Sequence, residues 1–362
     1  MKIQALICMW FCGVLAAADF HIYAPSPTAS TLWVIKAQEQ GEMLSLQVVE
    51  KTALGFAGRA IVAHPQQPWV YVAAPPGKEK ETIKTALIRL KADGSVALVE
   101  PQANSNGAGY LSLDHQHRFL LGSDYGAGEV SVYSLDEKGQ VGKRVSYEKM
   151  PNPYSHAILT SPDNAFVYIP FVKEHNALLQ YRFDANTGSL TALTPHNVMP
   201  PAGTGPRHIV YHPTLPLVYF SNEQHLGLSL YRRAEDGTLS IVQVCDALSA
   251  NEKVDGMTAS DIVITPDGKF IFTGIRGGKN DFDKVARYQL AADGTAKLLG
   301  LTPADKTPWG FTLSPDGRYL MVTASVGGTL TVYRIGNDGT LTKAAAVACD
   351  KGMVDVVCRP AF

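Results

Sequence analysis

The chain has 362 residues, of which 46% are hydrophobic and 18% are charged, as is typical of a folded globular protein rather than a disordered one. The formal net charge is −1 and no run of lysine or arginine occurs, which argues against a nucleic acid partner. The length fits one large or two ordinary domains, so composition alone does not give the number of domains.

The first segment has the pattern of a secretory signal peptide. Lys2 precedes a mostly apolar run from Ile3 to Leu15, and three alanines follow at 16–18. We therefore expect residues 1–18 to be a signal peptide that is cleaved before Asp19, which would make the mature protein periplasmic or secreted. The run is shorter than the roughly 20 residues of a membrane span and no second such stretch occurs, so we expect no membrane anchor.

Three cysteines remain after residues 1–18 are removed: Cys245, Cys349 and Cys358. An odd number argues against a disulfide framework. One bond between Cys349 and Cys358 is compatible with an oxidising compartment, and buried thiols are the alternative.

One turn signature recurs along the rest of the chain. Its clear copies are Ser-Pro-Asp-Asn at 161–164, Thr-Pro-Asp-Gly at 265–268 and Ser-Pro-Asp-Gly at 314–317. Looser copies are His64-Pro65, Asp114-His115, His212-Pro213 and Arg359-Pro360. These seven anchors are 45 to 53 residues apart, and such a nearly constant period indicates seven structural units.

Short runs of β-branched and aromatic residues flank the anchors. In one unit, residues 209–211 precede the turn and residues 217–220 follow it, as the two strands of a hairpin would. A third run at 228–231, the turn Asp236-Gly237 and a fourth run complete the unit. Four strands in a period of about 50 residues are typical of a propeller blade, so the sequence predicts an all-β, seven-bladed β-propeller with four antiparallel strands per blade.

The two ends of the chain predict how the ring closes. The seventh anchor lies two residues before the C-terminus, so its unit has only a first strand, at 354–358. The missing strands match runs at 20–23, 31–36 and 44–49. We expect both termini to share one blade, which removes exposed sheet edges, and residues 19–362 to form one propeller domain.

The same pattern predicts which side chains meet at one mouth of the central channel. The first strand of a blade runs down the channel and the second returns, so residues about six before and ten after each anchor should share a mouth. These positions hold Arg59, Tyr125, His156, Arg207, Glu223, Arg276 and Trp309. A solvated polar rim explains any one of them, but their clustering on neighbouring blades favours a small-molecule site.

His208 and Asp261 are one residue out of this phase. Because side chains alternate along a strand, we expect His208 to point away from the channel and both residues to have structural roles. The sequence contains no Gly-x-Ser-x-Gly elbow, no His-Glu-x-x-His motif and no Walker loop.

Four stretches carry a resemblance to a known family: 155–157, 205–213, 221–223 and 261–268. On these the chain resembles the seven-bladed lactonase family, which includes bacterial 6-phosphogluconolactonases and fungal carboxymuconate-cyclizing enzymes. The resemblance covers essentially the whole mature chain. It implies a reaction on a lactone carbonyl at a site formed by His156, Arg207, Glu223 and Arg276.

These residue types suit lactone hydrolysis. His156 and Glu223 can share the proton transfers, and which of them is the base stays open. Arg207 and Arg276 can stabilise the oxyanion or hold a substrate carboxylate or hydroxyl. We expect substrate contacts from Arg59, Tyr125 and Trp309, and the scheme requires no metal or cofactor.

The expected substrate is a small, unphosphorylated lactone. An exported enzyme meets few sugar phosphates, and uncharged Pro75 and Trp309 stand near positions where the resemblance implies arginines in cytosolic phosphogluconolactonases. We therefore expect a monomer that hydrolyses glucono-1,5-lactone. The alternatives are hydrolysis of 6-phosphoglucono-1,5-lactone, a cyclase-type addition, and a non-catalytic propeller that binds a ligand or partner.

Overall fold

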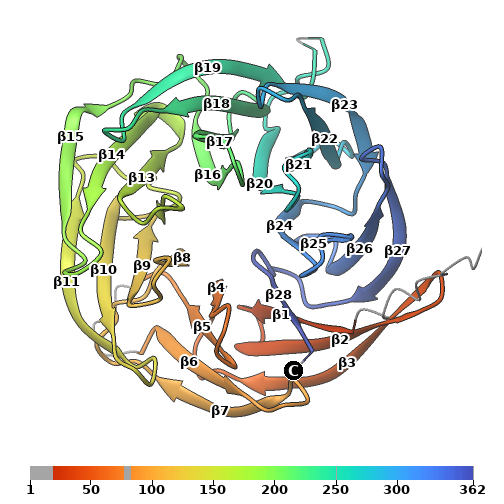
Figure 1. Cartoon of the computed structure of the whole chain (residues 1–362). Coiled ribbons are helices and arrows are strands. Elements are labelled where there is room, and N and C mark those ends of the chain that lie inside the picture. The colour runs from red at the N-terminus through yellow and green to blue at the C-terminus, as the bar shows by residue number, and fades with distance from the viewer. Residues whose placement is uncertain (1–18, 77–82, 250, 362) are drawn as a thin grey trace, which may run out of the picture.

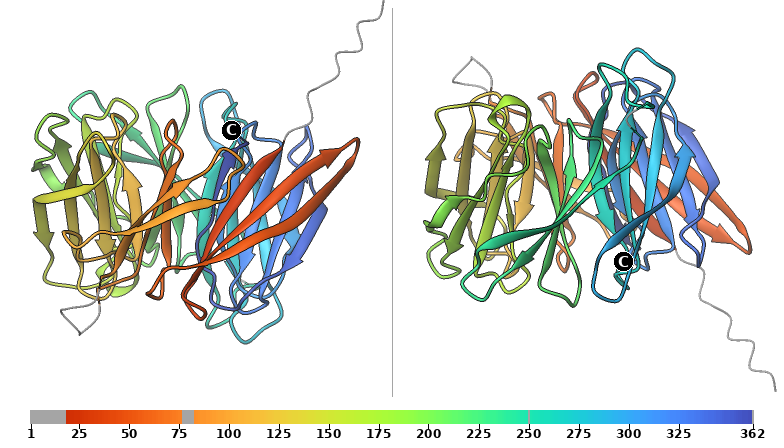
Figure 2. Two further views of the ribbon diagram at one scale, coloured as in Figure 1. Left: turned by 90° about the horizontal axis from the view of Figure 1, so that it is seen from below. Right: turned by 90° about the horizontal axis from the view of Figure 1, so that it is seen from above.

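The computed structural model describes residues 19–76, 83–249 and 251–361, and these residues form seven antiparallel sheets of four strands each. Figure 1 shows the sheets arranged radially around a central channel. The predicted seven-bladed β-propeller is therefore confirmed. Seen from the side, loops project from both faces of the ring (Figure 2). Among the described residues, no helix has the length and apolar character that crossing a membrane requires.

The blades follow one another in chain order, with one 3-10 turn, η1 (Lys173–His175), between β13 and β14. The strands are β1 (Phe20–Ser26), β2 (Thr31–Gln40), β3 (Met43–Ala53), β4 (Ala60–Ala63), β5 (Trp69–Ala73), β6 (Thr85–Leu90), β7 (Val96–Pro101), β8 (Tyr110–Leu113), β9 (Phe119–Asp124), β10 (Glu129–Leu135), β11 (Val141–Lys149), β12 (Leu159–Thr160), β13 (Phe166–Phe171), β14 (Ala177–Phe183), β15 (Leu190–Asn197), β16 (Pro206–Tyr211), β17 (Leu217–Asn222), β18 (Gly227–Arg233), β19 (Leu239–Asp246), β20 (Thr258–Ile264), β21 (Phe270–Arg276), β22 (Lys284–Leu290), β23 (Ala296–Pro303), β24 (Pro308–Leu313), β25 (Tyr319–Ala324), β26 (Thr329–Ile335), β27 (Leu341–Ala348) and β28 (Val357–Pro360).

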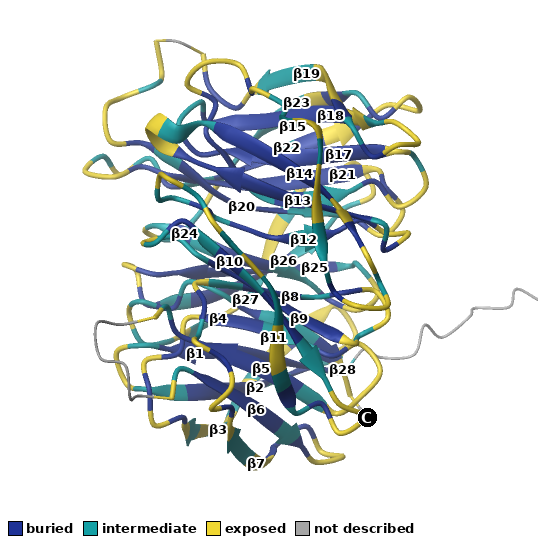
Figure 3. Cartoon of the chain, turned by 90° about the vertical axis from the view of Figure 1, so that its left-hand side faces the viewer, coloured by how far each residue is buried: buried dark blue, intermediate teal, exposed yellow. Residues whose placement is uncertain are grey.

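The position of a strand in its blade explains its sequence pattern. Second strands such as β13 and β17 are buried along their whole length, because neighbouring blades cover both of their faces. The outermost strand β3 alternates between exposed and less exposed residues, because one of its faces meets solvent. Figure 3 shows the buried strands inside and the exposed loops outside. The apolar core lies between blades, where Leu230 belongs to the same cluster as Ile271 of the next blade.

The ring closes through both ends of the chain, as predicted. β1 pairs with β28 in antiparallel register, from Phe20 opposite Pro360 to Tyr23 opposite Val357. The last strand begins three residues later than the predicted 354–358. One reason is that Asp355 leaves the ladder and its Oδ2 accepts the backbone N–H of Ile61 in the next blade at 3.0 Å.

The cysteines of the described chain, Cys245, Cys349 and Cys358, are free thiols. Of the two alternatives, the structure therefore shows unpaired thiols rather than a Cys349–Cys358 disulfide. Burial raises the pKa of the Cys349 thiol to about 12, so this thiol is uncharged at neutral pH.

Buried tyrosines join neighbouring blades at a repeated position. A tyrosine hydroxyl on the second strand of one blade donates a hydrogen bond to the carbonyl of a glycine in the last turn of the next blade. The bonds are Tyr23 to Gly94, Tyr71 to Gly139, Tyr168 to Gly237 and Tyr219 to Gly294, at 2.7 to 2.8 Å. These bonds fix adjacent blades relative to each other, and so they help to hold the inner strands that carry the channel side chains.

Candidate active site

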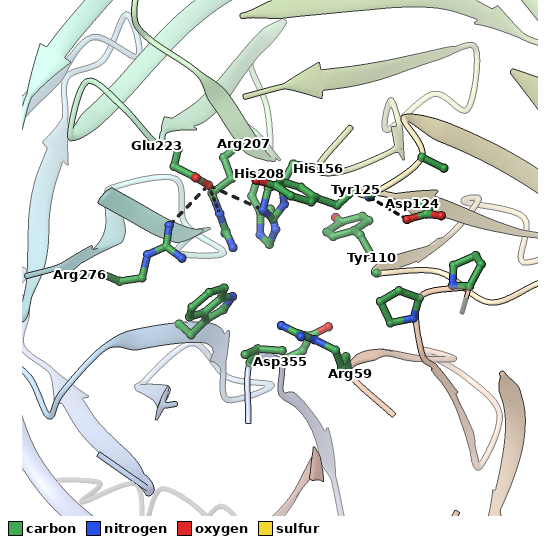
Figure 4. Close-up of a pocket in the computed structure, with 17 residues that line it drawn as sticks. Arg59, Tyr110, Asp124, Tyr125, His156, Arg207, His208, Glu223, Arg276 and Asp355 are labelled. Atoms are coloured by element: carbon green, nitrogen blue, oxygen red, sulfur yellow. Dashed lines mark hydrogen bonds and ion pairs between the residues drawn. The ribbon is translucent and has the colours of Figure 1, made fainter. Parts of the chain in front are cut away.

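One mouth of the channel holds a cavity of about 730 Å³ (Figure 4). All seven site residues expected from the sequence line it: Arg59, Tyr125, His156, Arg207, Glu223, Arg276 and Trp309. Arg59 lies beside Asp355, on the side of the cavity opposite Glu223. The positions inferred from the blade repeat therefore converge in space.

The central side chains come from three neighbouring blades. His156 lies just before the short strand β12, and its backbone N–H is bonded to the carbonyl of Pro170 at 3.0 Å. Arg207 is the second residue of β16, Glu223 follows the end of β17, and Arg276 is the last residue of β21. Strand ends thus place these groups at one mouth of the channel.

Glu223 is the centre of a buried charge cluster. Its Oε2 lies 3.0 Å from Nε of Arg207, 3.5 Å from Nη2 of Arg276 and 3.7 Å from Nε2 of His156. Arg207 is fully buried, while Glu223 and Arg276 are each 7% exposed. Burial, together with the charge of Arg207, lowers the pKa of Arg276 to about 10, so Arg276 still carries its charge at neutral pH.

Several buried donors of this cluster have no partner among the described residues. They include Nη1 and Nη2 of Arg207 and Nε of Arg276. A buried polar group without a hydrogen bond costs about 1–3 kcal/mol, so such groups call for an explanation. Donors held in place without a partner are suited to an anionic oxygen that forms during a reaction.

The two histidines of the cavity are uncharged at neutral pH. Burial, followed by the charges of Arg207 and His208, places the pKa of His156 well below its ordinary value. Burial and the charge of Arg207 also lower the pKa of His208, although Asp261 opposes this effect. Neutral imidazoles next to unpartnered guanidinium donors can accept or donate protons where negative charge develops.

His208 does not point away from the channel, so that expectation is wrong. His208 lines the cavity, and its Nδ1 lies 2.6 Å from Oδ1 of Asp261. The reason is a β-bulge: the register of β16 against β17 shifts between Pro206 and Ile209, which interrupts the alternation of side chains. The strands β20 and β24 shift at equivalent places.

The aromatic side chains line the walls. The guanidinium of Arg276 lies 4.3 Å and that of Arg207 5.8 Å from the centroid of the Trp309 ring. Tyr125 packs edge-on against His156 with ring centroids 5.3 Å apart. The mouth therefore combines charged groups with flat apolar surfaces, as is usual for small-molecule sites.

Tyr110 and Asp355 also line the cavity, although we did not predict them from the sequence. Both lie five residues before an anchor, as do His208 and Asp261, so a search at that phase would have found them. Burial, with the nearby charge of Asp261, raises the pKa of Asp355 to about 7. In the described part of the chain, no group of three or more His, Cys, Asp and Glu side chains is arranged to hold a metal ion.

Comparison with known proteins supplies the family. Residues 21–357 match the family described as "Lactonase, 7-bladed beta-propeller". The chain belongs to this lactonase family. It is 30% identical over 341 residues to the 6-phosphogluconolactonase of Cronobacter sakazakii, covering 93% of this chain and 97% of that protein.

Solved structures of similar shape agree with the lactonase fold. The periplasmic gluconolactonase PpgL of Pseudomonas aeruginosa has a TM-score of 0.80 at 19% identity, covering 94% of this chain and 99% of that one. A Bacteroides fragilis protein has a TM-score of 0.81 at 17% identity, covering 94% of this chain and 98% of that one. At these identities the likeness concerns the fold alone.

Proposed function

We propose that this lactonase family member hydrolyses a sugar lactone in the channel cavity, and that its favoured substrate is glucono-1,5-lactone. The observation that carries the proposal is the buried guanidinium of Arg207. Its two terminal nitrogens have no hydrogen-bond partner among the residues that the structure describes, and it lies beside neutral imidazoles.

In this scheme the lactone carbonyl oxygen lies against Arg207. As water adds to the carbonyl carbon, negative charge develops on that oxygen, and the terminal nitrogens of Arg207 donate hydrogen bonds to it. Arg276 adds positive charge, and Glu223 holds both guanidinium groups through its Oε2. His156, 3.7 Å from Glu223, donates a hydrogen bond from its ring to the substrate.

The choice of an unphosphorylated substrate rests on the walls of the cavity. Pro75 and Trp309 are uncharged, and the cluster of Arg207 and Arg276 is partly neutralised by Glu223. Trp309 offers a flat face for a sugar ring. We place the protein in the periplasm, because residues 1–18 have a signal peptide pattern and a structural neighbour is a periplasmic gluconolactonase.

A second candidate is hydrolysis of the 6-phosphate of the same lactone. Two observations favour it: the relative from Cronobacter sakazakii is a 6-phosphogluconolactonase, and Arg59 adds a further cation to the cavity wall. A phosphate bound beside Arg59 would account for an exposed cation at this mouth.

The test is the rate of acid release by purified residues 19–362, above the spontaneous rate, with glucono-1,5-lactone and its 6-phosphate in parallel. We expect a higher kcat/KM for the unphosphorylated lactone. A preference for the phosphate would establish the second candidate. No acceleration of either would overturn both and favour a propeller that only binds its ligand.

A further inference from the structure

We propose that His208, held by Asp261, is the general base that takes a proton from the attacking water. This assignment deepens the lactone hydrolysis proposed above and rests on it. It gives a chemical role to the histidine and the buried carboxylate that the blade repeat predicts to be structural.

Asp261 determines the tautomer of His208. Asp261 is fixed from two sides, because its Oδ1 accepts the backbone N–H of Ile262 at 2.8 Å and its Oδ2 accepts that of Phe311 at 2.9 Å. Burial alone would raise the pKa of Asp261, but His208 and Arg207 together hold it below its ordinary value. An ionised carboxylate only accepts hydrogen bonds, so Nδ1 of His208 carries the proton in the 2.6 Å contact.

Nε2 of His208 is free to accept a proton. A neutral imidazole with its proton on Nδ1 has a lone pair on Nε2. Within the described residues, no hydrogen bond to Nε2 of His208 is formed, and this nitrogen is not among the buried atoms that lack a partner. The ring lines the cavity and is held edge-on by Tyr110 and His156, with centroids 5.1 and 5.0 Å away. His208 therefore presents a proton acceptor to the cavity.

His156 and Glu223 are the other two candidates for the general base. In the described part of the chain, Nδ1 of His156 is buried without a partner, and the negative charge of Glu223 near Nε2 favours the proton on Nε2. His156 thus presents an N–H donor to the cavity. Oε2 of Glu223 lies against both Arg207 and Arg276, so its charge is already engaged. Of these three residues, His208 is the one with a free lone pair on an accessible nitrogen, because the lone pair of His156 lies on its buried Nδ1 and Glu223 is paired with two arginines.

In the proposed reaction, His208 takes a proton from water and later returns it to the substrate. Water gives one proton to Nε2 of His208 as its oxygen bonds to the carbonyl carbon, and Arg207 donates hydrogen bonds to the resulting oxyanion. The carbon–oxygen bond of the ring then breaks, and the His208 imidazolium returns its proton to the ring oxygen. Asp261 remains ionised throughout and stabilises the imidazolium. The product acid loses its proton to solvent.

The charges around His208 set the pH dependence. After burial, Arg207 lowers its pKa, whereas Asp261 and Glu223 raise it, and His156 and Tyr110 face it as uncharged rings. Because a base must be unprotonated, turnover should fall as pH decreases below the ordinary histidine value of about 6.5, as His208 gains a proton.

The test is His208→Gln, whose amide can still bond to Asp261 but cannot take a proton at neutral pH. We expect kcat to fall by about 10²–10⁴-fold, with KM within about threefold of wild type and an unchanged melting temperature. Asp261→Asn should lower kcat less and move the acid limb of the pH profile to lower pH, because a charge that raises the pKa of His208 is lost. A purely structural role would not move that limb.

The matched control is His225→Gln, which alters a histidine–aspartate pair outside the cavity, with Nε2 of His225 3.0 Å from Asp246. This variant should keep wild-type kcat. If the wild type opens the lactone and His208→Gln retains its kcat, the base assignment fails while the proposed function stands. If the wild type opens no lactone, both fail.

A measurement on the wild-type protein covers the case in which the variants do not fold. ¹⁵N NMR at pH 7.5 should show a protonated Nδ1 and an unprotonated Nε2 for His208. A proton on Nε2 would overturn the assignment.

Discussion

Glu223 is the residue that joins the charged groups of the cavity, since a single oxygen lies near two guanidinium groups and one imidazole. Such a carboxylate positions its neighbours and offsets their charge. Removing one partner of a buried ion pair leaves the others without compensation, which is costly.

Glu223→Gln should therefore reduce turnover at least tenfold while the chain stays folded, because the amide keeps the shape of the side chain but not its charge. His156→Ala should also reduce turnover at least tenfold, since it removes a donor next to the substrate. Steady-state kinetics with circular dichroism checks both. Glu129→Gln is the control, because its 2.9 Å pair with Lys149 is exposed, and it should keep the wild-type rate. Wild-type rates in both site variants would contradict the site assignment.

The sequence placed the channel residues well, because a propeller repeats its geometry with the period of its anchors. His156, Arg207, Glu223 and Arg276 could be located by counting from the turns. The orientation of His208 could not, since it depends on a bulge between Pro206 and Ile209 in β16, and the alternation of side chains assumed for a regular strand does not hold there. Here the N–H of His208 is bonded to Oγ of Ser221 at 3.2 Å, a contact that depends on tertiary structure.

Among the secondary-structure elements, the second strands contribute most to joining the blades. Tyr219 on β17 is fully buried, and its hydroxyl donates to the carbonyl of Gly294 in the next blade at 2.7 Å. The same bond recurs at Tyr23, Tyr71 and Tyr168. A buried tyrosine that lacks such a bond supplies a matched comparison.

Tyr219→Phe should lower the free energy of unfolding by about 1–2 kcal/mol, because it leaves the Gly294 carbonyl without its partner. Tyr181→Phe should change it little, since the buried hydroxyl of Tyr181 has no hydrogen-bond partner within the described ranges. Urea unfolding measures both, and kcat should be unchanged in each. Equal effects in the two variants would show that the bond between blades adds no stability.

For the molecule as a whole, the number of blades could be predicted from the repeat, and the closure of the ring could be predicted from the complementary strands at the two chain ends. The predicted start of β28 was wrong, because Asp355 leaves the strand and bonds to the next blade. Such a contact between blades cannot be recognised from the pattern of residues in a strand. The histidines are the remaining large-scale feature, because many of them are buried or half-buried.

Eight of the ten histidines have a pKa lowered chiefly by burial, and that of His64 falls to about 4. Between the folded and unfolded pKa values the unfolded chain binds more protons, so the free energy of unfolding should fall as pH decreases from 6.5 towards 4. Two carboxyl groups oppose this effect, because burial raises the pKa of Asp124 and raises that of Asp355 to about 7. Urea midpoints between pH 7.5 and 4.5 check the direction. A midpoint that stays constant or rises on acidification would contradict it.

The central claim is that the buried arginine of this cavity stabilises the oxyanion of an opening lactone. The most direct measurement is acid release from glucono-1,5-lactone by residues 19–362 and by the Arg207→Met variant, each corrected for the spontaneous rate. We predict a wild-type rate proportional to protein concentration and a fall of about 10²–10³-fold in the folded variant. A wild-type rate no faster than the spontaneous one, or a variant as fast as wild type, would contradict it.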